Sequence, residues 1–308
     1  MTARDLVGYG RRPPSFTWPN GARLAVSLVV NFEEGGELSI EAGDGVTERF
    51  GEVQSVQPPG VRDLAQESTF DYGMRVGIWR FLDAFAAHQM PATFMMCGRA
   101  VERAPEIARA AVAAGHEPAV HGWRWLAHSH YQERAAERAD IIRTRDAIFA
   151  ATGETPVGFM CRGGQSPWTR GLLAELGFLY DSNALDDDLP YWRDTDGGRT
   201  MLVVPYGFDT NDMKFFHPNG FVRPDDFSCY VGAALNLLLD EASAGQTKVL
   251  SIGFHLRICG RPARFAAVRT ILERLAAAGD RVWIARRRDI AAHFASVQAH
   301  STQQITVS

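Results

Sequence analysis

The sequence predicts an α/β protein in which parallel strands curl into a barrel covered by helices. In the run Leu24–Val30, six of the seven residues are apolar, which is typical of a strand buried on both faces. Strand-like and helix-like segments then alternate from about residue 24 to about residue 296. Because repeated β–α units imply parallel strands with right-handed crossovers, we expect the carboxyl ends of these strands to meet at one end of the fold.

Short apolar runs mark seven strands. Seven strands are enough for a barrel that has one strand fewer than the usual eight. The first of these runs ends in polar residues and glycines, the composition expected where an α/β protein places its chemistry. The strands that we expect are Leu24–Glu33, Ala92–Gly98, Glu117–Gly122, Val157–Arg162, Leu202–Phe208, Lys248–His255 and Val282–Arg286.

The segments between these strands have the apolar spacing of amphipathic helices. Ile78, Phe81 and Leu82, for example, recur at the i, i+3 and i+4 positions that share one helix face. Pro91 and Gly153 stand where helices are expected to end. The helices that we expect are Met74–His88, Arg99–Ala114, Gln132–Ala151, Thr169–Leu176, Asp225–Ala244 and Ala263–Ala278.

No linker or shift in composition divides the chain, so we expect one domain over residues 21–297. Residues 1–20, rich in Pro, Gly and Arg, predict an arm on the surface, and residues 298–308 predict a frayed tail. The stretch Gly35–Tyr72 is too long for an ordinary connection and predicts a loop that shapes a pocket or contacts another subunit.

Composition and charge give no indication of a nucleic-acid or membrane partner. The chain has 308 residues, 46% of them hydrophobic, and a formal net charge of −4, which gives no reason to expect nucleic acid or an anionic membrane as partner. No apolar run approaches the ~20 residues of a membrane span, and residues 1–14 lack the apolar core of a signal peptide. The four cysteines form no CxxC motif, which is typical of reduced thiols in a cytoplasmic protein.

Polar side chains that follow separate strands form the candidate site. Glu33, Arg162 and His255 each end a predicted strand, and His121 follows a strand-like segment, so the barrel can bring the four together. A carboxylate can take a proton from water, a histidine can protonate a leaving nitrogen, and an arginine can hold an oxyanion, as amide or ester hydrolysis requires. Taken singly, each has a structural alternative, and Arg162 could simply pair with Asp186 or Asp187.

Several segments of the chain are long and distinctive enough to compare with known families. They are RDLVGYG (4–10), VNFEEGGE (30–37), HGWRW (121–125), GFLYDS (177–182), DDDLPYW (186–192), DTNDMKF (209–215) and SIGFHLRICGRPAR (251–264). Through these segments the chain resembles the polysaccharide deacetylase (NodB-like) superfamily, and within it most of all the bacterial cofactor-independent allantoinases and cyclic imide hydrolases. The resemblance implies an irregular (β/α)7 barrel, a cyclic amide, imide or ureide as small-molecule substrate, no cofactor, and a homotetramer.

The chain departs from the deacetylases at their metal site. Asn31 falls where their base aspartate is expected, and Glu33 falls where their ligand aspartate is expected. His121 matches the first histidine of their HxxxH segment, but Trp125 replaces the second and has no lone pair for a metal. The resemblance therefore implies no obligatory metal, although Glu33 and His121 could form a weak residual site.

The resemblance and the residue chemistry together suggest roles for single residues. We expect Glu33, with Glu34 as substitute, to activate water, and His121 and His255 to donate a proton or polarise the carbonyl. Which histidine has which role stays open. Substrate contacts are expected from Asn31 for the amide, from Arg162, Trp125 and the flat wall of Trp168, and from Arg257 or Arg261 for a product carboxylate.

Two other functions fit the same sequence. One is a metal-dependent deacetylase of a polysaccharide or amine, with zinc bound by Glu33, His121 and a third ligand such as His255. The other is a non-catalytic binding protein on a barrel that has lost its activity, since two expected catalytic positions are substituted.

Overall fold

The centre of the fold is strand β1 (Leu24–Phe32), all nine residues of which are buried. The computed structural model describes residues 4–53 and 56–298. On one side β1 pairs in parallel with β8 (Lys248–His255) along its whole length. On the other side it pairs first with β9 (Val282–Ile284) and then with β2 (Thr93–Met96). These pairings make β1 a central strand. Its alternate side chains from Leu24 onward pack in one apolar cluster, and Ala25 and Val29 pack in another, which explains why the sequence of β1 is apolar on both faces.

The other strands extend the sheet away from β1. The order is β6-β7-β5-β4-β3-β2-β1-β8, and all neighbours are parallel except β6 and β7. The sheet curls into an incomplete barrel, and no pairing within the described residues joins β8 to β6. The predicted fold class, an irregular α/β barrel, is confirmed. The remaining strands are β3 (Glu117–Val120), β4 (Gly158–Phe159), β5 (Tyr180–Asp181), β6 (Tyr191–Asp194) and β7 (Thr200–Val203).

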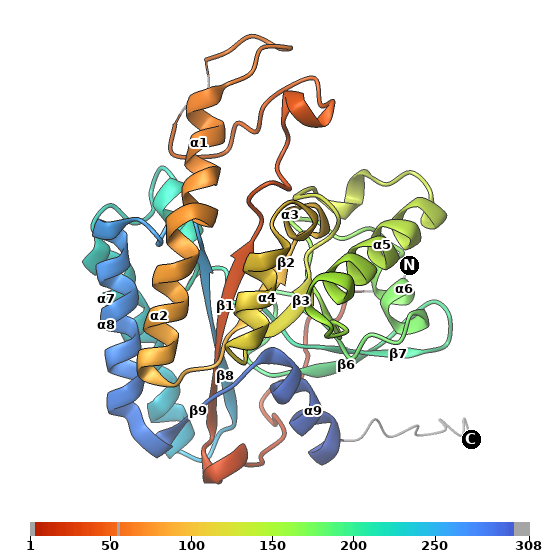
Figure 1. Ribbon diagram of the computed structural model, residues 1–308. Coiled ribbons are helices and arrows are strands. Elements are labelled where there is room, and N and C mark those ends of the chain that lie inside the picture. The colour runs from red at the N-terminus through yellow and green to blue at the C-terminus, as the bar shows by residue number, and fades with distance from the viewer. Residues whose placement is uncertain (1–3, 54–55, 299–308) are drawn as a thin grey trace.

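Helices cover the outside of the sheet. Figure 1 shows α2, α7 and α8 on one side of β1 and α3, α4 and α5 on the other. Their apolar faces pack on the sheet in one continuous core, which explains the helical spacing in the sequence. The bounds are α2 (Ile78–His88), α3 (Gly98–Arg103), α4 (Pro105–Ala113), α5 (Arg134–Thr152), α6 (Thr169–Glu175), α7 (Pro224–Ser243), α8 (Pro262–Ala278) and α9 (Arg287–Val297).

Several elements differ from the predictions. The expected loop Gly35–Tyr72 contains helix α1 (Leu64–Tyr72), which is capped by the Asp63 carboxylate and continues through a π-helical turn into α2. The expected helix Arg99–Ala114 is broken at Ala104, because a residue that precedes a proline disfavours helical geometry. Helix α9 and strands β5 and β6 were not predicted; the last two span only two and four residues.

The amino-terminal residues that are described lie against the barrel. Trp18 is buried and donates its indole N–H to the carbonyl of Lys248 (3.0 Å), and the Tyr9 hydroxyl contacts the carbonyl of Pro190 (2.6 Å). The predicted tail lies outside the described residues from 299 onward. No helix in the described part of the chain combines the length and apolar character of a membrane span.

Candidate active site

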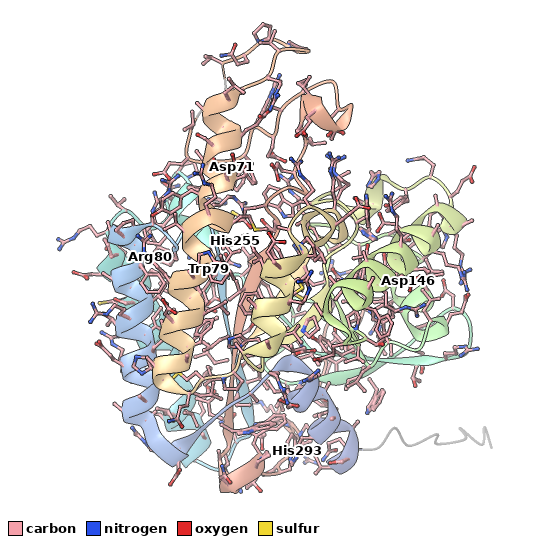
Figure 2. All side chains as sticks on the ribbon, in the orientation of Figure 1. Asp71, Trp79, Arg80, Asp146, His255 and His293 are labelled. Carbon is pink, nitrogen blue, oxygen red and sulfur yellow. The ribbon has the colours of Figure 1, made fainter. Side chains whose placement is uncertain are left out.

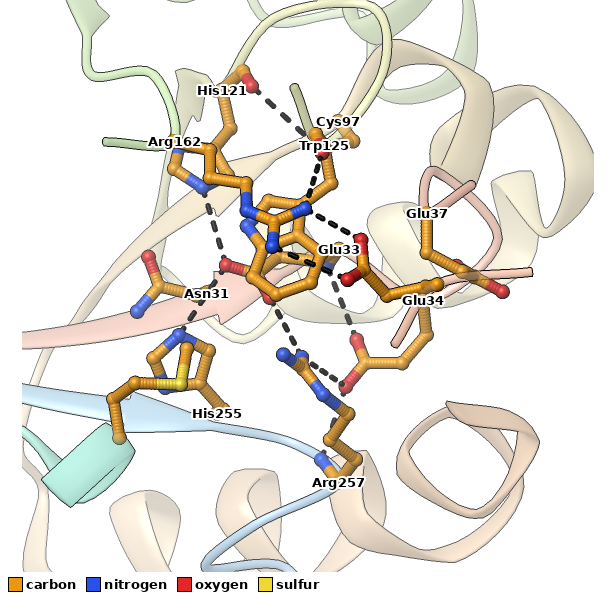
Figure 3. Close-up of polar contacts among 12 residues, drawn as sticks. Asn31, Glu33, Glu34, Glu37, Cys97, His121, Trp125, Arg162, His255 and Arg257 are labelled. Carbon is orange, nitrogen blue, oxygen red and sulfur yellow. Dashed lines mark hydrogen bonds and ion pairs between the residues drawn. The ribbon is translucent and has the colours of Figure 1, made fainter. Parts of the chain in front are cut away.

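Strand ends bring Glu33, His121 and His255 together, as the sequence suggests. These residues follow β1, follow β3 and end β8, and all three are at least 97% buried. Oε1 of Glu33 lies 3.3 Å from Nε2 of His121 and 3.3 Å from Nε2 of His255. Figure 3 shows one carboxylate facing both imidazoles, and Figure 2 places His255 at the end of the barrel from which α1 projects. The site therefore lies at the carboxyl end of the sheet.

His255 is held as a cation between two carboxylates. Its Nδ1 donates to Oδ1 of Asp212 at 2.6 Å, and its Nε2 faces Glu33. Burial alone would lower the pKa of His255, but Glu33 and Asp212 outweigh it and raise this pKa to about 9. The imidazole thus carries both protons at neutral pH and can give one away. Asp212 itself is fixed by the backbone N–H groups of His255 (2.8 Å) and Cys259 (3.2 Å).

The carboxylate of Glu33 is ionised in this setting. Burial favours its neutral form, but His255, Arg257 and His121 together hold the pKa of Glu33 well below its usual range. Nη1 of Arg257 contributes the shortest contact, 2.6 Å to Oε2. Glu34 points away from the histidines: its two oxygens accept from the backbone N–H of Arg257 (3.0 Å) and of Glu33 (3.1 Å). Burial raises the pKa of Glu34 to about 7.

His121 has a defined tautomer. Its Nδ1 lies 2.7 Å from the carbonyl oxygen of Met160, which can only accept, so Nδ1 carries a proton. The other ring nitrogen, Nε2, faces Oε1 of Glu33.

These groups open into a cavity of about 410 Å³, within the roughly 300–1,000 Å³ of pockets that hold small molecules. Asn31, Glu33, His121 and His255 all line it. Uncharged polar groups and apolar side chains complete the wall. The polar ones are Ser182, Asn183, Tyr206 and Asn211, and the apolar ones are Phe50, Trp125, Met160, Leu185, Phe208 and Met213.

Arg162 and Trp125 form one wall of this cavity. The guanidinium of Arg162 lies 3.6 Å from the centroid of the Trp125 ring. Its partner is Glu48, which both of its terminal nitrogens contact at 2.6 and 3.3 Å, rather than Asp186 or Asp187. Glu48 comes from the long segment after β1, so this segment contributes to the pocket.

The other predicted contacts lie outside the cavity. Arg257 is buried behind Glu33, with its guanidinium against the rings of Phe70 and Trp125. Arg261 stacks on Tyr72, 3.8 Å from the ring centroid to the guanidinium carbon. Trp168 precedes α6 and packs against the core. None of the three lines the cavity.

The side chains do not fit a divalent metal ion. Trp125 supplies no lone pair, and the Arg257 cation already occupies Oε2 of Glu33. Among residues 4–53 and 56–298, no group of three or more His, Cys, Asp and Glu side chains is arranged to hold a metal.

Several residues of the site were missed from the sequence, among them Glu48, Asn183 and three that lie close to the histidines. Asp212, Asn211 and Tyr206 come from the connection between β7 and α7. The first two belong to the segment DTNDMKF, whose resemblance to relatives was the one signal that could have drawn attention to them.

Comparisons with known proteins now identify the family. A Schizosaccharomyces pombe protein that is named for the polysaccharide deacetylases is 34% identical over 310 aligned residues, which cover 94% of this chain and 95% of that protein. The chain belongs to the polysaccharide deacetylase family. A model of the polysaccharide deacetylase domain also matches residues 65–180. The predicted superfamily is thereby confirmed.

Two solved structures are similar to this chain over almost its whole length. The crystal structure of PuuE allantoinase has 42% sequence identity and a TM-score of 0.90, over 97% of this chain and 99% of that one. A Pseudomonas aeruginosa protein, also named for the polysaccharide deacetylases, has 42% identity and a TM-score of 0.88, over 96% and 99% of the two chains.

Proposed function

We propose that this protein is a hydrolase that opens a cyclic amide, imide or ureide ring by attack of water on a C–N amide bond. The observation that carries the proposal is the position of Oε1 of Glu33, at 3.3 Å from Nε2 of both His121 and His255 at the edge of the cavity. An amide carbonyl is a poor electrophile, so water must be activated and the leaving nitrogen protonated. A carboxylate beside an imidazolium supplies both functions.

In the proposed reaction, Glu33 takes a proton from water as the water oxygen attacks the carbonyl carbon. The C–N bond then breaks, and Nε2 of His255 gives its proton to the leaving nitrogen. Burial favours protonation of Glu33, and the His255 cation is the strongest influence against it. Loss of the proton from His255 therefore favours the protonated form that Glu33 has reached by that point.

The contact between Glu33 and His255 also allows both groups to return to their starting protonation states. After the reaction Glu33 holds the proton from water and His255 lacks one. Because Oε1 and Nε2 lie 3.3 Å apart, the proton can pass directly from the carboxylic acid back to the imidazole. In this scheme Arg257 orients Glu33, and His121 positions the attacking water through Nε2.

The shape and polarity of the cavity support a small uncharged ring as substrate. Apolar side chains can enclose the ring, while the amide and hydroxyl groups of Asn31, Asn183 and Tyr206 can bind its polar edge. The similarity to PuuE allantoinase over almost the whole chain supports the same class. The four free cysteines fit a reducing compartment, and we propose the cytoplasm.

A substrate screen tests the proposal. Purified protein is assayed with hydantoin, allantoin, succinimide and an acetylated sugar oligomer, each with and without a chelator. Ring opening that survives chelation supports the proposal. Deacetylation of the sugar that needs added zinc would favour the metal-dependent deacetylase, and turnover of none would favour a binding protein.

A further inference from the structure

The hydroxyl of Tyr206 has a free proton beside the candidate catalytic groups. Tyr206 lines the cavity together with Asn31 and His255. Its hydroxyl oxygen accepts from Nδ2 of Asn211 at 2.7 Å and from Nδ2 of Asn31 at 3.4 Å. A phenolic oxygen has two lone pairs and one proton, so both lone pairs are engaged. Within the described residues, no hydrogen bond engages the proton.

The orientation of both amides is fixed by their other contacts. Nδ2 of Asn31 also donates to the carbonyl of Phe254 (3.1 Å), which can only accept. Oδ1 of Asn211 accepts from the backbone N–H of Met213 (2.7 Å), so its nitrogen must be the atom facing Tyr206. Both N–H groups of Asn31 are thus engaged. What Asn31 retains for a ligand is the acceptor Oδ1, just as Tyr206 retains a donor.

Strand β8 has a glycine where Tyr206 and Asn211 approach its backbone. A Cβ atom at Gly253 would stand 2.1 Å from the Tyr206 hydroxyl oxygen and 2.4 Å from Nδ2 of Asn211. Only glycine leaves room for these groups between the loop and the strand that carries His255. Burial raises the pKa of Tyr206, so the hydroxyl keeps its proton at neutral and alkaline pH.

We infer that Tyr206 and Asn31 together recognise the –CO–NH– edge of the ring, with the Tyr206 hydroxyl donating to the oxygen of the attacked carbonyl and Oδ1 of Asn31 accepting from the ring N–H. In a ring the amide is cis, so its C=O and N–H point to the same side and can meet a neighbouring donor and acceptor. In an open-chain N-acetyl group the amide is trans, and these groups point in opposite directions. The inference rests on the proposed function. It gives a structural reason for the proposed substrate class, since a cis amide presents both of its polar groups to this donor and acceptor.

Tyr206 then has a direct part in catalysis. When water adds to the carbonyl, negative charge develops on the oxygen that Tyr206 contacts, and the hydroxyl stabilises it without giving up its proton. Asn31 holds the N–H in the ring plane, which leaves the nitrogen lone pair for the proton of His255. Asn31 and His255 are register partners on β1 and β8, so the two side chains come from adjacent backbone positions.

Kinetics of Tyr206→Phe test the donor. The variant should lose about 10²–10³-fold in kcat, the usual effect of removing one oxyanion donor, with a smaller change in KM. Tyr230→Phe, at an exposed tyrosine on α7, is the matched control and should keep parental kinetics. If wild type opens cyclic amides and Tyr206→Phe does so at the parental rate, the inference is wrong while the proposed function stands.

A comparison of succinimide with N-methylsuccinimide tests the acceptor, and its wild-type measurement does not depend on any variant folding. Wild type and Tyr206→Phe should both prefer the substrate with an N–H in kcat/KM, and Asn31→Ala should lose that preference. A merely structural role for Asn31 would leave the ratio unchanged. Equal kcat/KM of wild type for the two substrates would overturn the Asn31 contact. If wild type opens neither ring nor any other cyclic amide, the proposed function fails and the inference with it.

Discussion

Glu33 and His255 form an ion pair inside the barrel, with Oε1 of the carboxylate 3.3 Å from Nε2 of the imidazolium. Glu33 directly follows β1, His255 ends the adjacent parallel strand β8, and Asp212 holds the far side of the imidazole at 2.6 Å. A base and an acid are thus already in contact before a substrate enters.

Replacing Glu33 by Gln should lower kcat by about two orders of magnitude or more, because an amide cannot take a proton from water. The fold should be retained, as judged by circular dichroism, since Gln has the same shape. Glu106→Gln, at an exposed position of α4, should have no effect. Near-parental turnover of Glu33→Gln would make Glu33 structural, and Glu34→Gln would then be measured.

Activity should fall as pH rises through about 9, where His255 loses the proton that it donates. In Asp212→Asn the negative charge that raises this pKa is lost, so the alkaline limb of the kcat/KM profile should move to lower pH by about 1 unit or more. Asp146→Asn, on the exposed side of α5, should leave the limb in place. An unchanged limb in Asp212→Asn would rule out His255 as the titrating acid.

The same ionisation should affect stability. The pKa of His255 is raised from the ordinary 6.5 to about 9 in the folded protein, so the folded state binds the proton more tightly than the unfolded one. The contribution of this group to the free energy of unfolding is therefore complete below pH about 6.5 and is lost as pH rises through about 9. Urea unfolding at pH 6, 8 and 10 measures it. A wild-type pH dependence that persists fully in His255→Gln would show that other groups cause it.

The purified protein should hold far less than one transition metal ion per chain, because Trp125 replaces a ligand and Arg257 neutralises Glu33. Elemental analysis measures the content, and assays after dialysis against a chelator measure the dependence. Stoichiometric zinc with activity lost on chelation would favour the deacetylase.

The chain should assemble as a symmetric homo-oligomer, with a tetramer of the 34.0 kDa chain expected first and a dimer second. Leu6 and Val7 of the arm and Val56 of the long segment after β1 are more than 75% exposed, and such apolar groups are commonly buried between subunits. Light scattering at micromolar concentration measures the mass. A mass near that of one chain would contradict the prediction.

The sequence was most informative where a buried strand is followed directly by a functional group. Apolar runs located β1 and β8, and this placed Glu33 and His255 at one end of the barrel. Asp212 could not be placed in this way, because it begins a 3-10 helix after a loop and meets His255 only through the fold. The pairing of Glu48 with Arg162 likewise joins residues 114 positions apart, a contact that no local pattern predicts.

Short or weakly patterned elements could not be predicted from the sequence either. Strand β5 has two residues, too few for an alternating pattern to emerge. Helix α1 follows a long irregular segment and has little separation of apolar and polar faces, so its residues were assigned to a loop. Its position depends instead on the Asp63 cap and on its continuation into α2.

The pairing of Glu48 with Arg162 shapes the pocket wall from a different part of the chain than the residues proposed to transfer protons. Glu33, His121 and His255 are anchored on or directly after strands, whereas Glu48 belongs to the irregular segment that precedes α1. A change at Glu48 would release Arg162 from its place over Trp125 and reshape one wall of the pocket without touching the groups proposed to handle protons. Under the proposed function, a library made at this one loop position should therefore change which ring the pocket admits while the groups proposed for hydrolysis stay in place.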